Sequence, residues 1–166
     1  MNTLAWYYPK DLKEAGLLVQ EPDIAPHGGG TGLLRTGLNR LRGLIDLRHL
    51  PLFDCQTRGG VVEVGAGLTF SEAARRMQAI APDSVLVKSL SSAAATPLRH
   101  RITIGGSVAM APLWSDLLGP LIALDAEVTL VGAREGVFPV VDYVTSRQLH
   151  AGTLVTAVRI TGEPWR

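Results

Sequence analysis

The chain has 166 residues, of which 46% are hydrophobic and 19% are charged. This length predicts a single domain spanning 1–166, and the composition is typical of a globular chain with enough apolar material for a core. The net charge of +1 argues against a nucleic-acid-binding surface. The single cysteine, Cys55, excludes an internal disulfide and any iron–sulfur cluster or multi-cysteine zinc site held by this chain alone.

Targeting signals are not evident in the sequence. The first ten residues have no basic region followed by an apolar run, so we predict no signal peptide. The apolar stretches are interrupted by glycine and proline and fall short of the roughly 20 residues that a membrane span needs. We therefore expect a cytoplasmic protein.

The first part of the chain alternates short helical and extended patterns separated by glycine and proline. In the first helical pattern, Leu12, Leu17 and Leu18 are expected to face inward. The predicted elements are a helix over 11–20, an extended segment at 24–25, a buried strand over 43–47, a hairpin turn at 58–60 and a strand over 61–66.

The second part begins with the clearest local signal in the chain. Thr69 and Glu72 have the spacing of a capping box, and the helix that follows over 70–80 should bury one face. That face comprises Ala73, Ala74, Met77 and Ile80. The remaining predicted elements are a helix over 116–124 and strands over 126–131, 137–141 and 154–160. This mixture predicts an α+β fold with many tight turns.

Two glycine-rich segments are candidates for ligand binding. Gly28-Gly29-Gly30-Thr31-Gly32 lets the backbone approach a ligand closely, and its successive N–H groups suit a diphosphate. Its spacing matches neither the Rossmann fingerprint nor the Walker loop, and alone it is equally consistent with a surface turn. Thr103-Ile104-Gly105-Gly106-Ser107 is predicted as a second glycine-centred turn. The two segments are about 70 residues apart and together could hold the two ends of one extended dinucleotide.

These segments and their order resemble the FAD-binding subunit of the molybdenum hydroxylases, the group of xanthine dehydrogenase and carbon monoxide dehydrogenase. The resemblance extends from about Tyr8 to Ile160 and is most specific in the block over 99–109. Further matching blocks are 28–34, 44–47, 63–66, 70–77, 115–117 and 121–128. It implies a p-cresol-methylhydroxylase-type FAD-binding fold, with a small α/β lobe over about 1–51 and a larger lobe over about 52–166. FAD would lie in the cleft between them.

The resemblance also implies roles for particular residues. Backbone amides from Gly28 to Leu33 would wrap the FAD pyrophosphate, and residues 103–107 would make a second contact near the phosphate and ribityl chain. Asp116 would accept hydrogen bonds from the adenosine ribose, and Leu154 would lie along the adenine or the isoalloxazine. The full predicted set is Pro26, His27, Gly28, Gly29, Gly30, Thr31, Gly32, Leu33, Thr103, Ile104, Gly105, Gly106, Ser107, Asp116 and Leu154.

Two of these residues have simpler interpretations. Asp116 is also the charge expected near the start of a helix, where the helix dipole favours it. His27 could attach a flavin covalently, as in some relatives of the superfamily, although a loop histidine that hydrogen-bonds locally is the simpler interpretation. No catalytic residue and no metal ligand is predicted.

The function implied by the resemblance is electron transfer. Electrons would pass from iron–sulfur clusters of a small partner subunit, supplied by a molybdopterin-binding large subunit, through FAD to an external acceptor. One alternative is a flavin-free structural or assembly subunit. Gly32, Trp114 and the absence from this sequence of the family's C-terminal domain suggest it. Another is a stand-alone flavoprotein similar to glycolate oxidase, whose glycine-rich loop the segment from Pro26 to Leu33 also resembles.

Overall fold

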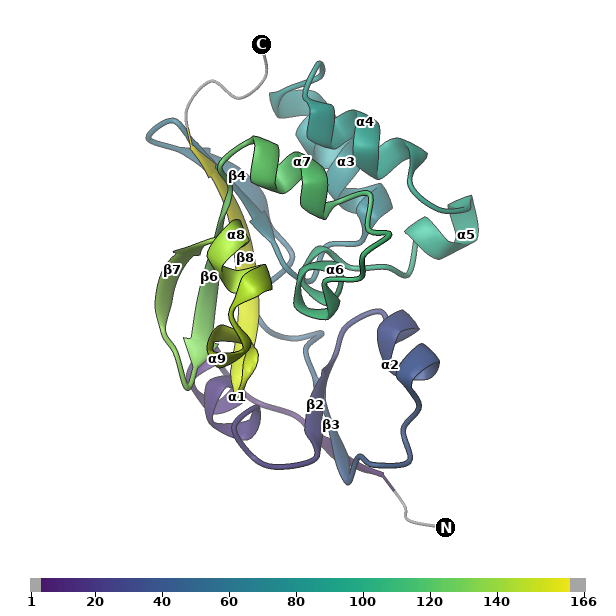
Figure 1. Ribbon diagram of the computed structural model, residues 1–166, viewed down its shortest axis with the longest axis vertical. Helices are drawn as coiled ribbons and strands as arrows, with labels where there is room; N and C mark the ends of the chain where they lie inside the picture. The colour runs from purple at the N-terminus through teal and green to yellow at the C-terminus, as the bar shows by residue number, and fades with distance from the viewer. Residues whose placement is uncertain (1–3, 162–166) are drawn as a thin grey trace.

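The computed structural model describes residues 4–161, and its strands form two sheets (Figure 1). The first is a three-stranded parallel sheet with the order β1-β3-β2. Because parallel neighbours need crossover connections, a helix follows each of the first two strands. In chain order this unit comprises β1 (Ala5–Tyr7), α1 (Leu12–Leu18), β2 (Ile24–His27), α2 (Thr31–Thr36) and β3 (Gly43–Asp46).

The second sheet has five strands in the order β4-β5-β8-β6-β7, all in antiparallel pairs. Its strands are β4 (Cys55–Arg58), β5 (Val61–Gly65), β6 (Glu127–Gly132), β7 (Gly136–Pro139) and β8 (Thr153–Thr161). The predicted hairpin between β4 and β5 is confirmed. Gly59 and Gly60 have φ of 56° and 79°, a conformation that glycine adopts without a steric penalty.

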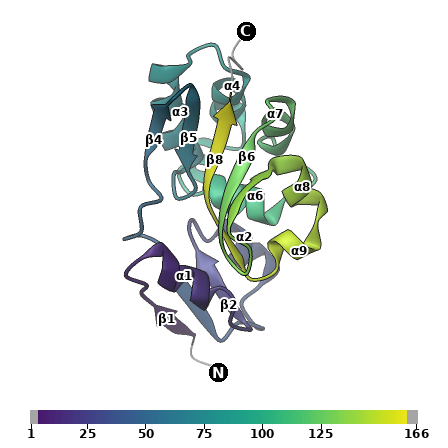
Figure 2. The same ribbon diagram turned by 90° about the vertical axis from the view of Figure 1, so that its left-hand side faces the viewer.

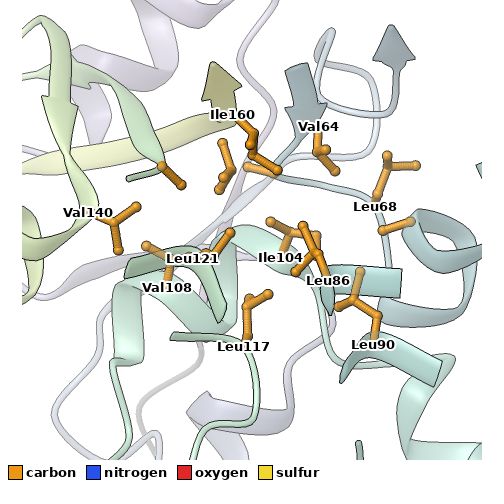
Figure 3. Close-up of a cluster of buried hydrophobic side chains, with 14 of the residues drawn as sticks. Val64, Leu68, Leu86, Leu90, Ile104, Val108, Leu117, Leu121, Val140 and Ile160 are labelled. Atoms are coloured by element: carbon orange, nitrogen blue, oxygen red, sulfur yellow. The ribbon is translucent and has the colours of Figure 1, made fainter. Parts of the chain in front are cut away.

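Helices between β5 and β6 cover one face of the second sheet, and two short helices lie between β7 and β8. They are α3 (Phe70–Ile80), α4 (Val85–Ser92), α5 (Thr96–Arg99), α6 (Ile104–Met110), α7 (Leu118–Ala123), α8 (Val140–Thr145) and α9 (Arg147–His150). The main core lies between this sheet and these helices. Val64 and Ile160 on the sheet face Ile104 and Leu86 on the helices (Figure 3).

A smaller core joins the two sheets. It contains Ala15 of α1 and Ile45 of β3, and Leu154 from the start of β8 completes it. Helix α1 packs against β6, and a Cβ atom on Gly16 would lie 3.1 Å from the backbone nitrogen of Gly132. Figure 2 shows this arrangement, with α1 beneath the lower ends of β6 and β8. The first sheet therefore shares apolar packing with the second.

Several sequence predictions were wrong in detail. Leu17 is 61% exposed, because α1 turns Ala15 and Gly16 toward the rest of the protein. Ile80 is 37% exposed at the last turn of α3. The predicted strand over 137–141 ends at Pro139, and a helix begins at the next residue. The sequence predictions did not include β1, α2, α4, α5, α8 and α9. The division into lobes near residue 51 stays a prediction, and residues 162–166 lie outside the described part.

Candidate functional site

The two glycine-rich segments line the same cavity. Its volume is about 590 Å³, and both Gly30 and Gly106 lie in its wall. The first segment follows β2 and leads into α2, whereas the second opens α6. These two helices are in contact (Figure 1). The walls are completed by the turn after β5, the segment between α6 and α7, and the start of β8.

The first segment makes a tight turn at the end of β2. Gly30 has φ of 76° and immediately precedes α2. Within the part of the chain that the structure describes, the backbone N–H groups of the next three residues, Thr31, Gly32 and Leu33, have no hydrogen-bond acceptor. Such groups are the unpaired donors found at the start of any helix, and they can bind an anion.

Gly29 is needed because the backbone at Arg101, two residues before the second segment, passes directly against it. A Cβ atom on Gly29 would lie 1.5 Å from the carbonyl oxygen of Arg101, which no side chain can tolerate. The Arg101 guanidinium in turn donates to the Gly29 carbonyl oxygen, with nitrogen–oxygen distances of 3.3 and 3.4 Å. The glycine therefore lets two distant parts of the backbone meet.

The second segment is the start of a helix, and the prediction of a turn was wrong. Thr103 caps α6, since its hydroxyl accepts from the Gly106 N–H at 3.1 Å. The N–H groups of Ile104 and Gly105 donate to the carbonyl oxygens of Leu68 and Ala66 at 2.9 and 2.8 Å. These amides are already used within the protein, because the segment is anchored to the turn after β5. The Gly106 N–H is likewise taken by Thr103, so a polar contact to a ligand from this side would come from the Ser107 hydroxyl.

Most of the predicted binding residues line the cavity. Ser107 lies with its hydroxyl 3.2 Å from that of Ser115, and Asp116 is exposed at the cavity wall. Leu154 contributes an apolar surface where β8 begins. The predicted residues found in the wall are Pro26, Gly28, Gly29, Gly30, Thr31, Gly32, Leu33, Thr103, Gly105, Gly106, Ser107, Asp116 and Leu154.

Two predicted residues lie elsewhere. Ile104 is buried in the main core, where the helical geometry of α6 directs it away from the cavity. His27 is not in the cavity wall; its ring packs edge-on against Trp6, with ring centroids 5.1 Å apart. His27 is the last residue of β2 and not a loop residue, and its place outside the cavity wall argues against covalent attachment of a flavin.

Arg35 and Trp114 are among the wall residues that the sequence did not predict as part of the site. The Cζ atom of Arg35 lies 4.7 Å from the centroid of the Trp114 ring, which is the geometry of a cation–π pair. Arg35 is four residues after Thr31, so recognition of α2 as a helix would have placed both on one face. From the sequence, Trp114 is an argument only for the flavin-free alternative.

Other ionisable groups lie outside the cavity wall. Burial raises the pKa of the Cys55 thiol, which favours its protonated form. Arg99 donates to the carbonyl oxygens of Ala93 and Ala94 at 3.2 and 2.7 Å and so ties α5 to the end of α4.

Among residues 4–161 there is no group of three or more His, Cys, Asp or Glu side chains that could hold a metal ion. None of the helices described in this range is long and apolar enough to cross a membrane.

Residues 2–161 match the family described as the FAD-binding domain in molybdopterin dehydrogenase. The chain belongs to this family. The predicted family resemblance and its cofactor, FAD, are thereby confirmed. No curated protein matches the chain.

Solved structures agree with the family assignment. The Cu,Mo-CO dehydrogenase in its cyanide-inactivated form matches with a TM-score of 0.85 and 26% identity, over 98% of this chain and 60% of that one. Reconstituted CO dehydrogenase from Oligotropha carboxidovorans matches with a TM-score of 0.84 and 26% identity, over 98% of this chain and 60% of that one. Quinoline 2-oxidoreductase from Pseudomonas putida 86 matches with a TM-score of 0.82 and 25% identity, over 96% and 59%. The chain thus spans about 60% of the length of these solved chains, and the predicted α+β, two-lobed fold is confirmed.

The cavity has the chemistry that FAD requires. Its first wall offers unpaired backbone donors and glycines at the place where side chains would block a diphosphate. Ser107 and Asp116 offer hydroxyl and carboxylate groups suited to the hydroxyls of a ribityl chain or a ribose. Leu154, Leu52 and Phe70 supply apolar surface for aromatic rings. The residues present therefore fit the cofactor of the family.

Proposed function

We propose that this chain is the FAD-binding electron-transfer subunit of a molybdenum hydroxylase complex. It would receive electrons from iron–sulfur clusters on a small partner subunit, fed by a molybdopterin-binding large subunit, and deliver them to an external acceptor. A cytoplasmic location is part of this proposal. The observation that carries it is the convergence of two glycine-rich segments on one cavity in a chain of the FAD-binding family. A single cysteine also means that these 166 residues by themselves cannot hold such clusters.

The chain's own residues would bind and orient the cofactor. FAD supplies the redox chemistry when bound, and the protein supplies position and electrostatics. The N–H groups of Thr31, Gly32 and Leu33 would donate to diphosphate oxygens. The Asp116 carboxylate, which can only accept hydrogen bonds when ionised, would hold ribose hydroxyls. The apolar wall around Leu154 would exclude water from one side of a ring system.

The decisive experiment is titration of the purified chain, freed of flavin, with FAD. The proposal expects a yellow complex with perturbed visible absorption and quenched flavin fluorescence. A chain that ignores FAD would instead support the flavin-free structural alternative. Co-purification with neighbouring subunits would then test the assignment of partners.

A pair of glycine variants tests whether the cavity is the binding site. Gly29→Ala places a methyl group against the Arg101 carbonyl, so the loop must shift, and we expect FAD affinity to fall at least about tenfold. Gly119→Ala is the matched control, because no atom lies within 4 Å of the added Cβ. Thermal melts of both variants show whether the fold is kept. Unchanged FAD affinity in a folded Gly29→Ala protein would contradict the assignment.

The purified chain loaded with FAD also tests the glycolate-oxidase-like alternative. An enzyme of that kind is reduced directly by a 2-hydroxy acid, whereas an electron-transfer subunit needs its partners. Bleaching of the flavin by a 2-hydroxy acid under anaerobic conditions, with no other subunit present, would therefore refute the proposed function.

A further inference from the structure

Two side chains from opposite walls of the cavity meet at its edge. Arg35 comes from the last turn of α2, and Trp114 comes from the segment between α6 and α7. The Arg35 guanidinium carbon lies 4.7 Å from the centroid of the Trp114 ring. Both residues line the cavity, although the Trp114 side chain is 68% exposed. The contact therefore restrains the Arg35 guanidinium against the face of the indole ring.

The cavity wall contains few charged side chains. Of the residues that line the cavity in the described part of the chain, Arg35 is the only lysine or arginine and Asp116 the only acidic residue. A diphosphate bridge carries two negative charges, whereas backbone N–H groups offer only partial positive charge. An arginine is the side chain best suited to this anion, because its planar guanidinium can donate two parallel hydrogen bonds.

The helical position of Arg35 directs it toward the glycine-rich turn. Arg35 is one helical turn after Thr31, so both lie on the same face of α2. Long side chains on helices lean toward the N-terminus, which here is the end formed by Gly30. The nearby alternative cation, Arg101, already donates to the Gly29 carbonyl oxygen. Among residues 4–161, Arg35 is therefore the cation available to a ligand at this turn.

We propose that Arg35 binds the diphosphate of FAD and that Trp114 is a positioning residue that holds its guanidinium over the cavity. This proposal deepens the proposed function and rests on it. The pair makes the chain selective for a flavin that carries a diphosphate over riboflavin, which carries none. Trp114 acts by restricting the many rotamers of an otherwise exposed arginine before the ligand arrives.

The first test compares FAD and riboflavin binding, measured by quenching of flavin fluorescence. We expect Arg35→Gln to weaken FAD binding by roughly tenfold and to leave riboflavin binding unchanged. Arg35→Lys keeps the charge and should recover part of the loss. The FAD affinity of the unaltered chain should fall with added salt, and this dependence should be smaller in Arg35→Gln. The salt series gives an answer even where riboflavin binds too weakly to measure.

The second test isolates Trp114. Trp114→Leu should weaken FAD binding several-fold in the unaltered chain and have no effect in the Arg35→Gln background, because the ring acts through the guanidinium. Trp114→Phe keeps an aromatic face and should retain most of the affinity. Trp6→Phe, an exposed aromatic outside the cavity wall, is the matched control.

The outcomes separate this inference from the proposed function. Equal loss of both flavins in Arg35→Gln, unchanged salt dependence, or additive effects of the two substitutions would overturn the role of the pair. In those cases FAD binding by the unaltered chain would still support the proposed function. Failure of the unaltered chain to bind FAD would overturn both.

Discussion

At the scale of single residues, one charged side chain is buried in a strand that is otherwise apolar. Residues 43–47 were predicted as a buried strand, and Asp46 at the end of β3 is only 4% exposed. The Arg48 guanidinium donates to both Asp46 carboxylate oxygens, with the shortest contact 2.6 Å, and the Arg48 N–H adds a further bond at 2.9 Å. Hydrogen bonds from Arg48 lower the pKa of Asp46, although burial alone would raise it.

This pair predicts a stability effect that depends on pH. Because the folded pKa of Asp46 is lowered, its contribution is present above the ordinary value of 3.8 and is lost as the pH falls through the lower folded value. Arg48→Met should therefore lower the urea midpoint at pH 7, and the difference from the unaltered chain should shrink below pH 3.8. Arg134→Met, which removes an exposed arginine without an ion pair in the described residues, is the control. A difference that persists unchanged at low pH would contradict this account.

At the scale of elements, α3 shows how a local sequence pattern determines a helix boundary. The Thr69 hydroxyl accepts from the Glu72 N–H at 3.3 Å, and the Glu72 carboxylate accepts from the Thr69 N–H at 2.9 Å. This is the predicted capping box, and α3 has the predicted bounds. Thr69 also pairs with Thr103, which caps α6, so the starts of two helices lie side by side. The hydrogen bond from Thr69 lowers the pKa of Glu72.

Removal of this cap has a definite expected cost. Thr69→Ala should reduce the free energy of unfolding by about 1 kcal/mol, because an orphaned N–H at the start of α3 loses its acceptor. Thr69→Ser keeps the hydroxyl and should lose much less. Urea unfolding followed by circular dichroism measures both. Equal losses for the two variants would show that the Thr69 methyl group, and not the cap, stabilises this region.

At the scale of the whole molecule, the smaller core decides whether the two sheets unfold together. Leu154 of β8 packs with Ala15, Ile24 and Ile45 of the first sheet unit, so each sheet buries apolar surface of the other. The cavity lies at this junction, because Leu154 is also part of its wall. Cooperative unfolding is the expected consequence of a shared core.

Tryptophan fluorescence can test this cooperativity directly. Trp6 reports on the first sheet, and Trp114 reports on the segment between α6 and α7. A Trp114→Phe/Trp165→Phe variant and a Trp6→Phe/Trp165→Phe variant should each unfold in one transition that coincides with its own circular dichroism transition. Leu154→Ala should lower the free energy of unfolding by about 2–5 kcal/mol, and by the same amount whichever tryptophan is followed. Separate transitions for the two tryptophans would show that the sheets unfold independently.

The amino-acid sequence by itself determined those features that depend on a few neighbouring residues. The buried strand at β3, the hairpin at Gly59 and Gly60, and the capped start of α3 each follow from local hydrogen bonding or hydrophobic pattern. The order of the motifs was sufficient to predict the family and its cofactor through their resemblance to a known family.

Only the tertiary structure decided how distant segments meet. Residues 103–107 form the start of a helix and not a turn: Thr103 caps it, and the distant carbonyl oxygens of Leu68 and Ala66 accept the N–H groups of Ile104 and Gly105. The exposure of Leu17, the approach of Arg101 to Gly29, and the pair of Arg35 and Trp114 depend likewise on the path of the intervening chain. Hydrogen-bonding propensity and periodicity are local properties of a chain, whereas a binding cavity is built from contacts between residues far apart in sequence, which no local pattern specifies.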